Sequence, residues 1–270
     1  MDVWLKHTVL NSTPVAQGYD TVLWNRDLLA DLIQKQFEVT VSGPTVSLPL
    51  KALGLSYQQP CYRDVARKES EVEFFLNHKF PMMQRLAKKM GADIGFEDEA
   101  GVGVMTRSGR TWGEVGHPPE IPVSMERGGY NLLSMITPEG TLHYTVTKSK
   151  VNSEQYIQFL FELIDGRPRP LILLTDQASF HQSQAVREFV RAHRAPWRIF
   201  FLPKRCPELN PDEQVWNEIK HNKIGKQPVK DKRDLGKRLF SALKSLQRCT
   251  QRIQSFFELP DTKYVLANVG

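Results

Sequence analysis

Residues 170–176 read Pro-Leu-Ile-Leu-Leu-Thr-Asp, and the fold class can be worked out from this run. A short, continuous apolar run that ends in polar residues is typical of a buried strand in a parallel sheet. Helical patterns flank it at residues 153–164, where Ser153 is the expected N-cap, and at residues 181–194. Another strand pattern follows at residues 197–202. Strands that alternate with helices predict an α/β domain.

Upstream of this run, the pattern is typical of strands joined by turns. Residues 92–98 and 121–125 are strand candidates, and we expect the first of them to end at Asp98. Residues 131–137 and 141–147 flank Pro-Glu-Gly, which predicts a hairpin turn. Hairpin strands run antiparallel, whereas strands joined through a helix usually run parallel. The sequence therefore predicts a mixed α/β sheet flanked by helices.

The N-terminal part of the chain shows helical patterns. Residues 24–37 carry an apolar stripe at helical spacing, with Asn25 as the expected N-cap. Ser42 can cap a second short helix that runs to Gly54. Two short helices with a tight turn between them resemble a helix-turn-helix. Pro49 departs from that pattern because an interior proline costs a helix about 3 kcal/mol, and the second helix lacks arginine, asparagine and glutamine to read bases.

A long charged helix is predicted over residues 66–90, with a kink at Pro81. It would join the N-terminal module to the sheet. We accordingly expect four parts: a partial helix-turn-helix module at 1–65, a linker helix at 66–91, the α/β domain at 92–224, and a basic helical extension at 225–270.

The composition excludes several classes of protein. With 270 residues, 40% of them hydrophobic, the chain can bury a core. Its 3 cysteines lie far apart, which excludes a disulfide scaffold and a cysteine zinc finger and fits a reducing cytosol. Its apolar runs are far shorter than the ~20 residues of a membrane helix, and its start does not read as a signal peptide. It has no GxGxxG, P-loop or GxSxG motif, which argues against a nucleotide cofactor and a small-molecule substrate.

Charge is distributed unevenly along the chain, whose net charge is +6. Residues 221–270 hold 11 basic and 4 acidic side chains, whereas residues 91–150 hold 5 basic and 8 acidic ones. A basic surface beside a carboxylate-rich centre suits a polyanionic substrate and a divalent metal ion. A solvated basic helix explains the C-terminal charge equally well.

Three acidic residues are expected at the ends of these elements: Asp98, Asp176 and Glu213. Ligand sites in open α/β sheets gather at the carboxyl ends of the strands. Hard cations such as Mg²⁺ prefer carboxylate oxygens. Two such ions, held about 3.5–4 Å apart, can activate an attacking oxygen and stabilise a leaving one in phosphoryl transfer. The three carboxylates are therefore a candidate two-metal site.

These acidic residues also have structural explanations. Glu97 or Glu99 could take the inward position, and Asp98 could simply start a turn. Glu213 falls at the third helical position if Asn210 is the N-cap and the following proline is the first helical residue. That is the capping-box arrangement, in which a glutamate satisfies a free backbone N–H at the start of a helix. From the residues alone, both explanations stay open.

Five motifs occur in order along the chain. They are Phe-Glu-Asp-Glu-Ala-Gly at 96–101, Gly-Arg-Thr-Trp at 109–112, Thr-Asp-Gln-Ala-Ser-Phe-His at 175–181, Phe-Leu-Pro at 201–203, and Pro-Glu-Leu-Asn-Pro-Asp-Glu-Gln-Val-Trp at 207–216. This series resembles the bacterial insertion-sequence transposases of the mariner superfamily, which carry an aspartate–aspartate–glutamate (DDE) triad. The last motif is the most specific, and the resemblance spans roughly residues 18–258.

The resemblance implies a ribonuclease-H-like catalytic core that cleaves and joins DNA strands with two Mg²⁺ ions per site, for which Mn²⁺ can substitute. Matched position for position, Asp98, Asp176 and Glu213 become the catalytic metal ligands. The capping and catalytic explanations of Glu213 are compatible, because a helix start can aim its side chain.

DNA contacts are expected around these ligands. The resemblance implies that Arg110 and Trp112 form a DNA-facing feature, with core packing of the indole as the alternative. It also implies that His181 positions water or DNA near the metals, unless it caps the next helix, and Trp216 is expected in the core. Further candidates for phosphate contacts are basic: Arg187, Arg191, Lys204, Arg205, Lys223 and Lys226.

Together these features predict a DNA transposase that cuts transposon ends and joins them to target DNA, with TA target sites implied by the family. The expected partners are double-stranded DNA, as inverted repeats and target, and a second copy of the chain, without a membrane or a nucleotide cofactor. The expected location is the bacterial cytoplasm, with the nucleoid.

Two alternatives stay open. One is a truncated, non-catalytic DNA-binding remnant, because we expect the chain to start within or after an additional helix-turn-helix of the family. Residues 1–50, with 3 basic and 5 acidic side chains, support it. The other is a ribonuclease-H-like nuclease without strand transfer.

Overall fold

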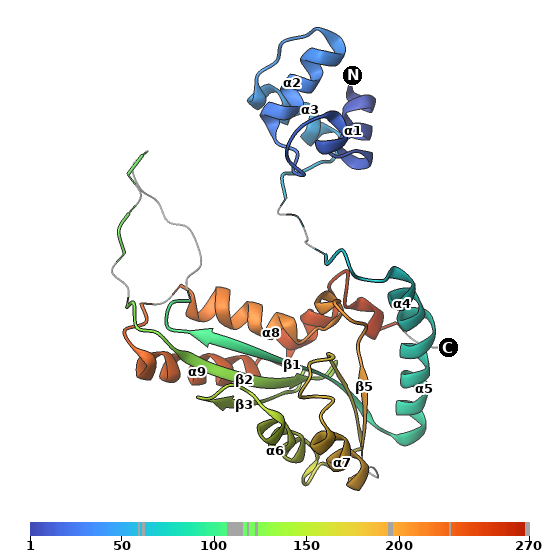
Figure 1. Cartoon of the computed structure of the whole chain (residues 1–270), viewed down its shortest axis with the longest axis vertical. Helices are drawn as coiled ribbons and strands as arrows, with labels where there is room; N and C mark the ends of the chain where they lie inside the picture. Colours follow the sequence, from blue (N-terminus) through green and yellow to red (C-terminus); the bar gives the residue numbers. More distant parts are fainter. Residues whose placement is uncertain are drawn as a thin grey trace. The chain divides into compact units, whose positions relative to one another are not determined.

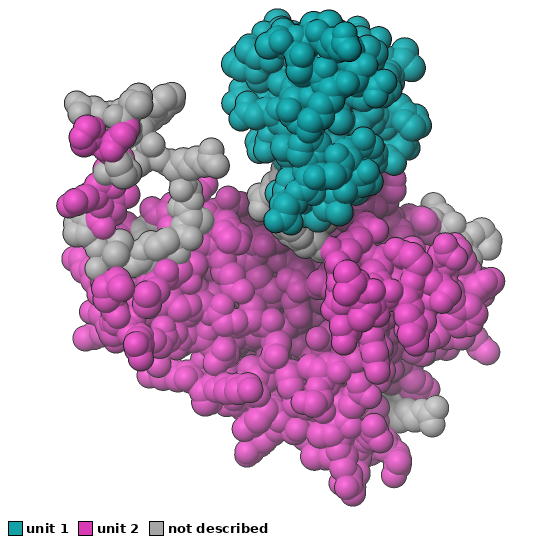
Figure 2. All heavy atoms as spheres, turned by 45° about the horizontal axis from the view of Figure 1, so that its top comes forward, with its two compact units in different colours: residues 1–62 teal, residues 63–270 magenta. Residues whose placement is uncertain are grey.

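The structure is a computed structural model, and it describes residues 1–58, 60, 63–106, 116–117, 119–121, 124–193, 197–226 and 228–267. The chain forms two compact units, Met1–Tyr62 and Arg63–Gly270, which Figure 2 shows in different colours.

The smaller unit is helical, with a small core of its own. It contains α1 (Asp2–Asn11), the 3-10 turn η1 (Val15–Gln17), α2 (Arg26–Phe37) and α3 (Gly43–Ala52). Its hydrophobic cluster takes buried residues from all three α-helices: Leu5, Leu29, Ile33 and Val46. The expected helical module is therefore present, with α1 as an addition that the sequence patterns did not indicate.

Both predicted caps in this unit are confirmed. The Asn25 side chain accepts hydrogen bonds from the backbone N–H groups of Asp27 and Leu28, at the start of α2. The Ser42 side chain accepts one from Thr45 at the start of α3. Pro49 lies inside α3, as the sequence indicated, and this helix continues through it to Ala52.

The larger unit is built on a five-stranded sheet with the order β3-β2-β1-β4-β5 (Figure 1). The strands are β1 (Asp93–Gly103), β2 (Gly129–Ile136), β3 (Leu142–Thr147), β4 (Leu171–Thr175) and β5 (Trp197–Phe201). β1, β2 and β3 pair antiparallel, whereas β4 runs parallel to both β1 and β5. The predicted mixed sheet is confirmed, including the hairpin between β2 and β3.

Two strand predictions are wrong. β1 does not end at Asp98, because β2 pairs with it from Phe96, opposite Ile136, to Gly103, opposite Gly129. Asp98 is therefore a mid-strand residue. The strand expected at 121–125 is not found at its described residues, which belong to no strand.

Side chains of each strand alternate between the two faces of the sheet. In β4, Leu171 and Leu173 pack on one face against α6 (Ser153–Ile164) and α7 (Gln184–Ala192). Ile172 and Leu174 belong to the larger cluster on the other face. This is why the whole of β4 is apolar.

The second face is covered by the remaining helices of this unit (Figure 1). They are α4 (Glu69–Phe74), the π-helix η2 (Phe75–Lys79), α5 (Phe80–Met90), α8 (Glu213–Asn217), the π-helix η4 (Glu218–Ile224), α9 (Lys232–Gln247) and α10 (Thr250–Gln254), with 3-10 turns η3 (Pro207–Leu209), η5 (Ser255–Phe257) and η6 (Lys263–Val265). None of the described helices is long and apolar enough to cross a membrane.

The helical run expected at residues 66–90 is present but divided. A π-helical turn, Phe75–Lys79, separates α4 from α5, and the N–H of Phe80 donates to the carbonyl of Phe75. Pro81 follows directly. Its ring would clash with the carbonyl of the residue four positions earlier in a regular α-helix. The distortion therefore precedes the proline instead of following it.

Three helix starts differ from expectation. α6 is capped by Asn152, not Ser153, through a capping box with Gln155. α7 begins at Gln184, with Ser183 as its cap, because the preceding residues form turns. The helix expected to open at Asn210 begins at Glu213, which is therefore not its third residue.

Candidate active site

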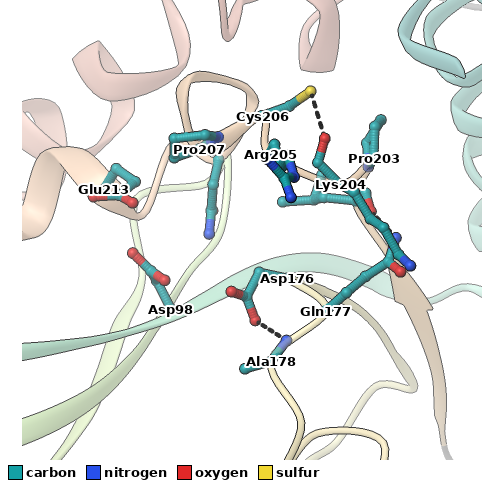
Figure 3. A pocket seen from close by; sticks show the side chains of 12 residues that line it. Asp98, Asp176, Gln177, Ala178, Pro203, Lys204, Arg205, Cys206, Pro207 and Glu213 are labelled. Atoms are coloured by element: carbon teal, nitrogen blue, oxygen red, sulfur yellow. Dashed lines mark hydrogen bonds between the residues drawn. The ribbon is translucent and has the colours of Figure 1, made fainter. Parts of the chain in front are cut away.

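Asp98, Asp176 and Glu213 line one cavity of about 320 Å³ in the larger unit. Figure 3 shows the three carboxylates facing the same space. The remaining lining residues come from the loops after β4 and β5: Gln177, Ala178, Leu202, Pro203, Lys204, Arg205, Cys206, Pro207 and Asn210. The structure thus brings together the three acidic residues that the sequence singled out.

Strand register brings the two aspartates together. β1 and β4 are parallel, with Phe96 opposite Leu174. Two residues further along both strands lie Asp98 and Asp176, and a shift of two residues returns each side chain to the same face of the sheet. Because β1 continues past this point while β4 ends at Thr175, Asp176 stands at the rim of the sheet beside a mid-strand Asp98.

Glu213 reaches the cavity from the start of α8, and its carboxyl group forms a hydrogen bond with that of Asp98. The indole Nε1 of Trp216 donates a second hydrogen bond to Asp98 Oδ2, at 3.1 Å. Trp216 is buried, so the expectation that it belongs to the core is confirmed. Its polar edge also fixes Asp98.

Asp98 and Glu213 are costly to ionise together, because several carboxyl groups lie close to one another here. Burial and the negative charges of Glu213 and Asp212 raise the pKa of Asp98, which is 8% exposed, well above its usual range. Burial also raises the pKa of Glu213, although the Lys220 ammonium opposes that shift. A hydrogen bond between two carboxyl groups requires a proton on one of them.

Asp176 differs from the other two acidic residues. Its side chain is 54% exposed and accepts hydrogen bonds from His181 Nδ1, at 2.8 Å, and from the backbone N–H of Ala178, at 2.9 Å. Burial acts to raise the pKa of Asp176, but these two donors outweigh it and hold the pKa below its ordinary value. The surroundings of Asp176 therefore favour its ionised form, whereas those of Asp98 and Glu213 oppose theirs.

Sequence reasoning missed a fourth carboxyl group, that of Asp212. It is fully buried, and its Oδ2 accepts a hydrogen bond from the Ser134 hydroxyl, whereas its Oδ1 has no hydrogen-bond partner among the described residues. Burial raises its pKa well above the ordinary value. The available signal was Ser134, a lone polar residue in the apolar run of β2.

The two neighbours of Asp98 in β1 do not take its place. Glu97 is fully buried on the opposite face, near Tyr156 and Thr175, and Glu99 is exposed. Of Glu97, Asp98 and Glu99, only Asp98 lines the cavity. The alternative that Glu97 or Glu99 is the cavity-facing acid is therefore wrong.

His181 lies beneath the cavity instead of lining it. The residue is 3% exposed, and its ring packs against Tyr156 and Phe180. It does not cap α7, because Ser183 does so. A direct contact between His181 and DNA does not fit this burial.

The basic candidates divide into two groups. Lys204 and Arg205 line the cavity. Arg187 and Arg191 are exposed on α7, which covers the other face of the sheet, and Lys223 and Lys226 lie at the end of η4 without lining the cavity. Arg110 and Trp112 lie outside the described residues.

The loop that carries Lys204 and Arg205 is held by residues 63–67, which we call the clasp segment. Arg205 forms an ion pair with Asp64 at 2.8 Å, and Arg67 forms one with Glu208. Arg205 has a φ of 59°, a left-handed conformation that costs a non-glycine residue about 1 kcal/mol. The clasp segment thus holds, through two ion pairs, the strained loop that lines one side of the cavity.

The donor set of the cavity fits a divalent cation. In the described part of the chain, no three His, Cys, Asp or Glu side chains already stand close enough together to form a metal centre. The three carboxylates nevertheless offer the hard oxygen donors that Mg²⁺ and Mn²⁺ prefer. A cation would also offset the repulsion between the Asp98 and Glu213 carboxylates, so these residues suit it chemically.

The chain belongs to the DDE superfamily endonucleases, whose family model matches residues 93–236, more than half of its length. A family model for a winged helix-turn-helix matches residues 20–79. These matches confirm the resemblance inferred from the five motifs at the level of the superfamily. A search of curated proteins found no match.

Solved structures of a mariner transposase, Mos1, share the fold. The Mos1 strand transfer complex has a TM-score of 0.62 at 18% identity, covering 100% of this chain and 79% of that one. A pre-cleavage Mos1 transpososome has a TM-score of 0.63 at 19% identity, covering 98% and 78%. The Mos1 mariner paired-end complex with Mn has a TM-score of 0.63 at 18% identity, covering 100% and 80%. The expected ribonuclease-H-like fold is confirmed.

Proposed function

We propose that this protein is a DNA transposase that cleaves strands at the ends of a mobile element and joins them to target DNA. The observation that carries the proposal is the convergence of Asp98, Asp176 and Glu213 on one cavity. Membership of the DDE superfamily endonucleases supports nucleic-acid chemistry at that cavity. The shared fold with complexes described as paired-end and strand transfer complexes supports transposition as its purpose.

Asp98, Asp176 and Glu213 would hold the divalent ions. Bound Mg²⁺ or Mn²⁺, two per site, would supply positive charge that stabilises the attacking and leaving oxygens of phosphoryl transfer. The protein side chains would define where these ions bind. Trp216 fixes the Asp98 carboxylate, and His181 and Ala178 fix that of Asp176.

Basic side chains at the cavity rim would bind the DNA backbone. Lys204 and Arg205 line the cavity beside the carboxylates, where they can contact phosphates on either side of the reacting one. Arg187, Arg191, Lys223 and Lys226 would contribute only to DNA that extends away from it. The helix-turn-helix module would bind the element end, and a second copy of the chain would hold the other end.

Target choice at TA steps is the finer part of this proposal. A TA step unstacks and kinks easily, so bending it into an active site costs less energy than bending other steps. Acting on DNA, the enzyme would work in the cytoplasm with the nucleoid.

The experiment uses the DNA that flanks the gene as the source of element ends. Full-length protein is incubated with such duplexes, a target plasmid and Mg²⁺, and both nicked and joined products are counted. Asp176→Asn should abolish both products and leave duplex binding nearly unchanged, whereas Asp165→Asn, at an exposed position after α6, should behave as wild type.

The outcomes separate the alternatives. Joined products support the transposase. Nicks without joining would indicate a nuclease without strand transfer, and binding without nicks would indicate a non-catalytic remnant. Cleavage that survives Asp176→Asn would overturn the assignment of the three carboxylates.

A further inference from the structure

A buried chain of polar groups runs from Asp176 into the opposite face of the sheet. His181 Nδ1 lies 2.8 Å from Asp176 Oδ1, and His181 Nε2 lies 3.5 Å from Glu97 Oε2. Thr175 donates its hydroxyl hydrogen to the same Glu97 oxygen. Glu97 is fully buried, and among the described residues its second oxygen has no hydrogen-bond partner. Such a group is costly to bury, so its place behind His181 needs an explanation.

The hydrogen-bond chemistry fixes the orientation of His181. An ionised carboxylate can only accept hydrogen bonds, so the ring nitrogen that faces Asp176 must be the donor. Nδ1 therefore carries a proton, and Nε2 is the nitrogen that faces Glu97. The side chain cannot exchange these roles without breaking its contact with Asp176.

Packing holds the ring in this position. The ring of His181 lies 4.1 Å from that of Phe180 and 4.4 Å from that of Tyr156, measured between centroids. The side chain of Asp176, in contrast, is more than half exposed, and its other hydrogen-bond donor among the described residues is a backbone N–H of the turn that follows it. The histidine is thus the rigid partner, and the aspartate is the side chain that gains order from the contact.

We propose that His181, backed by Glu97, is a positioning residue that fixes the rotamer of Asp176 and so sets the affinity of the cavity for its divalent cation. This inference rests on the proposed function, in which Asp176 is a ligand of that cation. Partners that orient a metal ligand from behind typically change metal affinity or activity by about 10–100-fold when they are replaced.

Two substitutions at the same position separate positioning from packing. The side-chain amide of asparagine can place its N–H near the position of Nδ1, whereas that of glutamine reaches instead toward the position of Nε2. His181→Asn should therefore keep the hydrogen bond to Asp176, and His181→Gln should lose it. Both variants remove the aromatic ring, so they share the loss of packing against Tyr156 and Phe180.

The measurement is Mn²⁺ binding to the full-length protein, followed by the paramagnetic resonance signal of the free ion. We expect His181→Gln to weaken Mn²⁺ binding about 10–100-fold and to raise the Mg²⁺ concentration for half-maximal cleavage in proportion. We expect His181→Asn to stay within a few-fold of wild type. His143→Gln, which changes a histidine on β3, is the matched control and should leave Mn²⁺ binding unchanged.

Asp176→Asn distinguishes a failure of this inference from a failure of the proposed function. If Asp176→Asn abolishes Mn²⁺ binding while both His181 variants bind equally well, or equally poorly, the positioning role is wrong and the proposed function stands. If Asp176→Asn leaves Mn²⁺ binding and cleavage intact, Asp176 is not a metal ligand and the assignment of the three carboxylates in the proposed function is wrong. Thermal unfolding without metal shows whether each variant is folded.

Discussion

Trp216 Nε1 and Asp98 Oδ2 form a buried hydrogen bond of 3.1 Å that joins α8 to the middle of β1. The indole is otherwise packed in the apolar core, so one side chain both stabilises the fold and orients a candidate metal ligand. The bond also explains why Asp98 can be accommodated inside a long strand. Its carboxyl group is held by a donor from the helix above the sheet.

Trp216→Phe is expected to lower the free energy of unfolding and the rate of cleavage together. Phenylalanine keeps most of the ring packing but leaves Asp98 without its donor, which costs about 1–3 kcal/mol. Trp197→Phe is the matched control, because Trp197 is equally buried and its Nε1 has no partner among the described residues. Calorimetry should show a larger loss for Trp216→Phe, and equal losses would contradict the role of this bond.

Asp98→Asn is expected to stabilise the metal-free protein while abolishing cleavage. Burial and neighbouring charges raise the folded-state pKa of Asp98, so the folded chain binds a proton that the unfolded chain releases near pH 4. The stability that this bound proton contributes is present at acidic pH and is lost as the pH rises through the folded-state pKa. Asparagine carries no charge and still accepts the bond from Trp216.

The measurement is the melting temperature in a chelator between pH 5 and pH 8. At pH 8 the melting temperature of the variant should exceed that of wild type by about 2–4 °C, which corresponds to about 1 kcal/mol in the free energy of unfolding. At pH 5 the difference in melting temperature should be smaller. A difference that grows toward acidic pH would have the wrong sign and would refute the raised pKa.

Divalent metal is expected to stabilise wild type through the same cavity. A ligand at a hundredfold excess over its Kd adds about 2.7 kcal/mol to the free energy of unfolding. Wild type should therefore melt at a higher temperature in Mg²⁺ or Mn²⁺, and Asp176→Asn should lose most of that increase. Scanning fluorimetry with and without metal measures this increase in melting temperature. An equal increase in wild type and Asp176→Asn would mean that the metal binds elsewhere.

Arg67→Met is expected to destabilise the larger unit by about 2 kcal/mol. The Arg67 side chain is 8% exposed and pairs with Glu208, which would lose its partner. Removing one member of a fully buried pair costs about 3–5 kcal/mol, and the partial exposure of Glu208 reduces that figure. Lys68→Met, which removes an exposed pair with Glu71, should cost far less in urea unfolding.

Local patterns in the sequence were sufficient for much of the fold. The apolar run of β4 and the cap at Asn25 are properties of neighbouring residues, and both were predicted. The end of β1 was predicted wrongly, because it depends on pairing with β2. That strand begins 26 residues after β1 ends. A strand that gains partners beyond its apolar part continues through polar residues such as Asp98.

The same distinction holds for the site. Asp98, Asp176 and Glu213 could be proposed because each stands in a motif. The buried groups behind them could not, since their roles depend on which face of the sheet they occupy. Asp212 was missed, and His181 was expected to cap a helix or to position water or DNA, whereas both side chains are buried.

The clasp segment determines where a fragment of the larger unit can begin. Asp64 and Arg67 precede α4 and hold Arg205 and Glu208 beside the cavity. A catalytic fragment designed from its first helix at Glu69 would therefore discard both anchors and leave the strained Arg205 turn unsupported. Domain-swap chimaeras and crystallisation fragments should keep the chain from Arg63 onward.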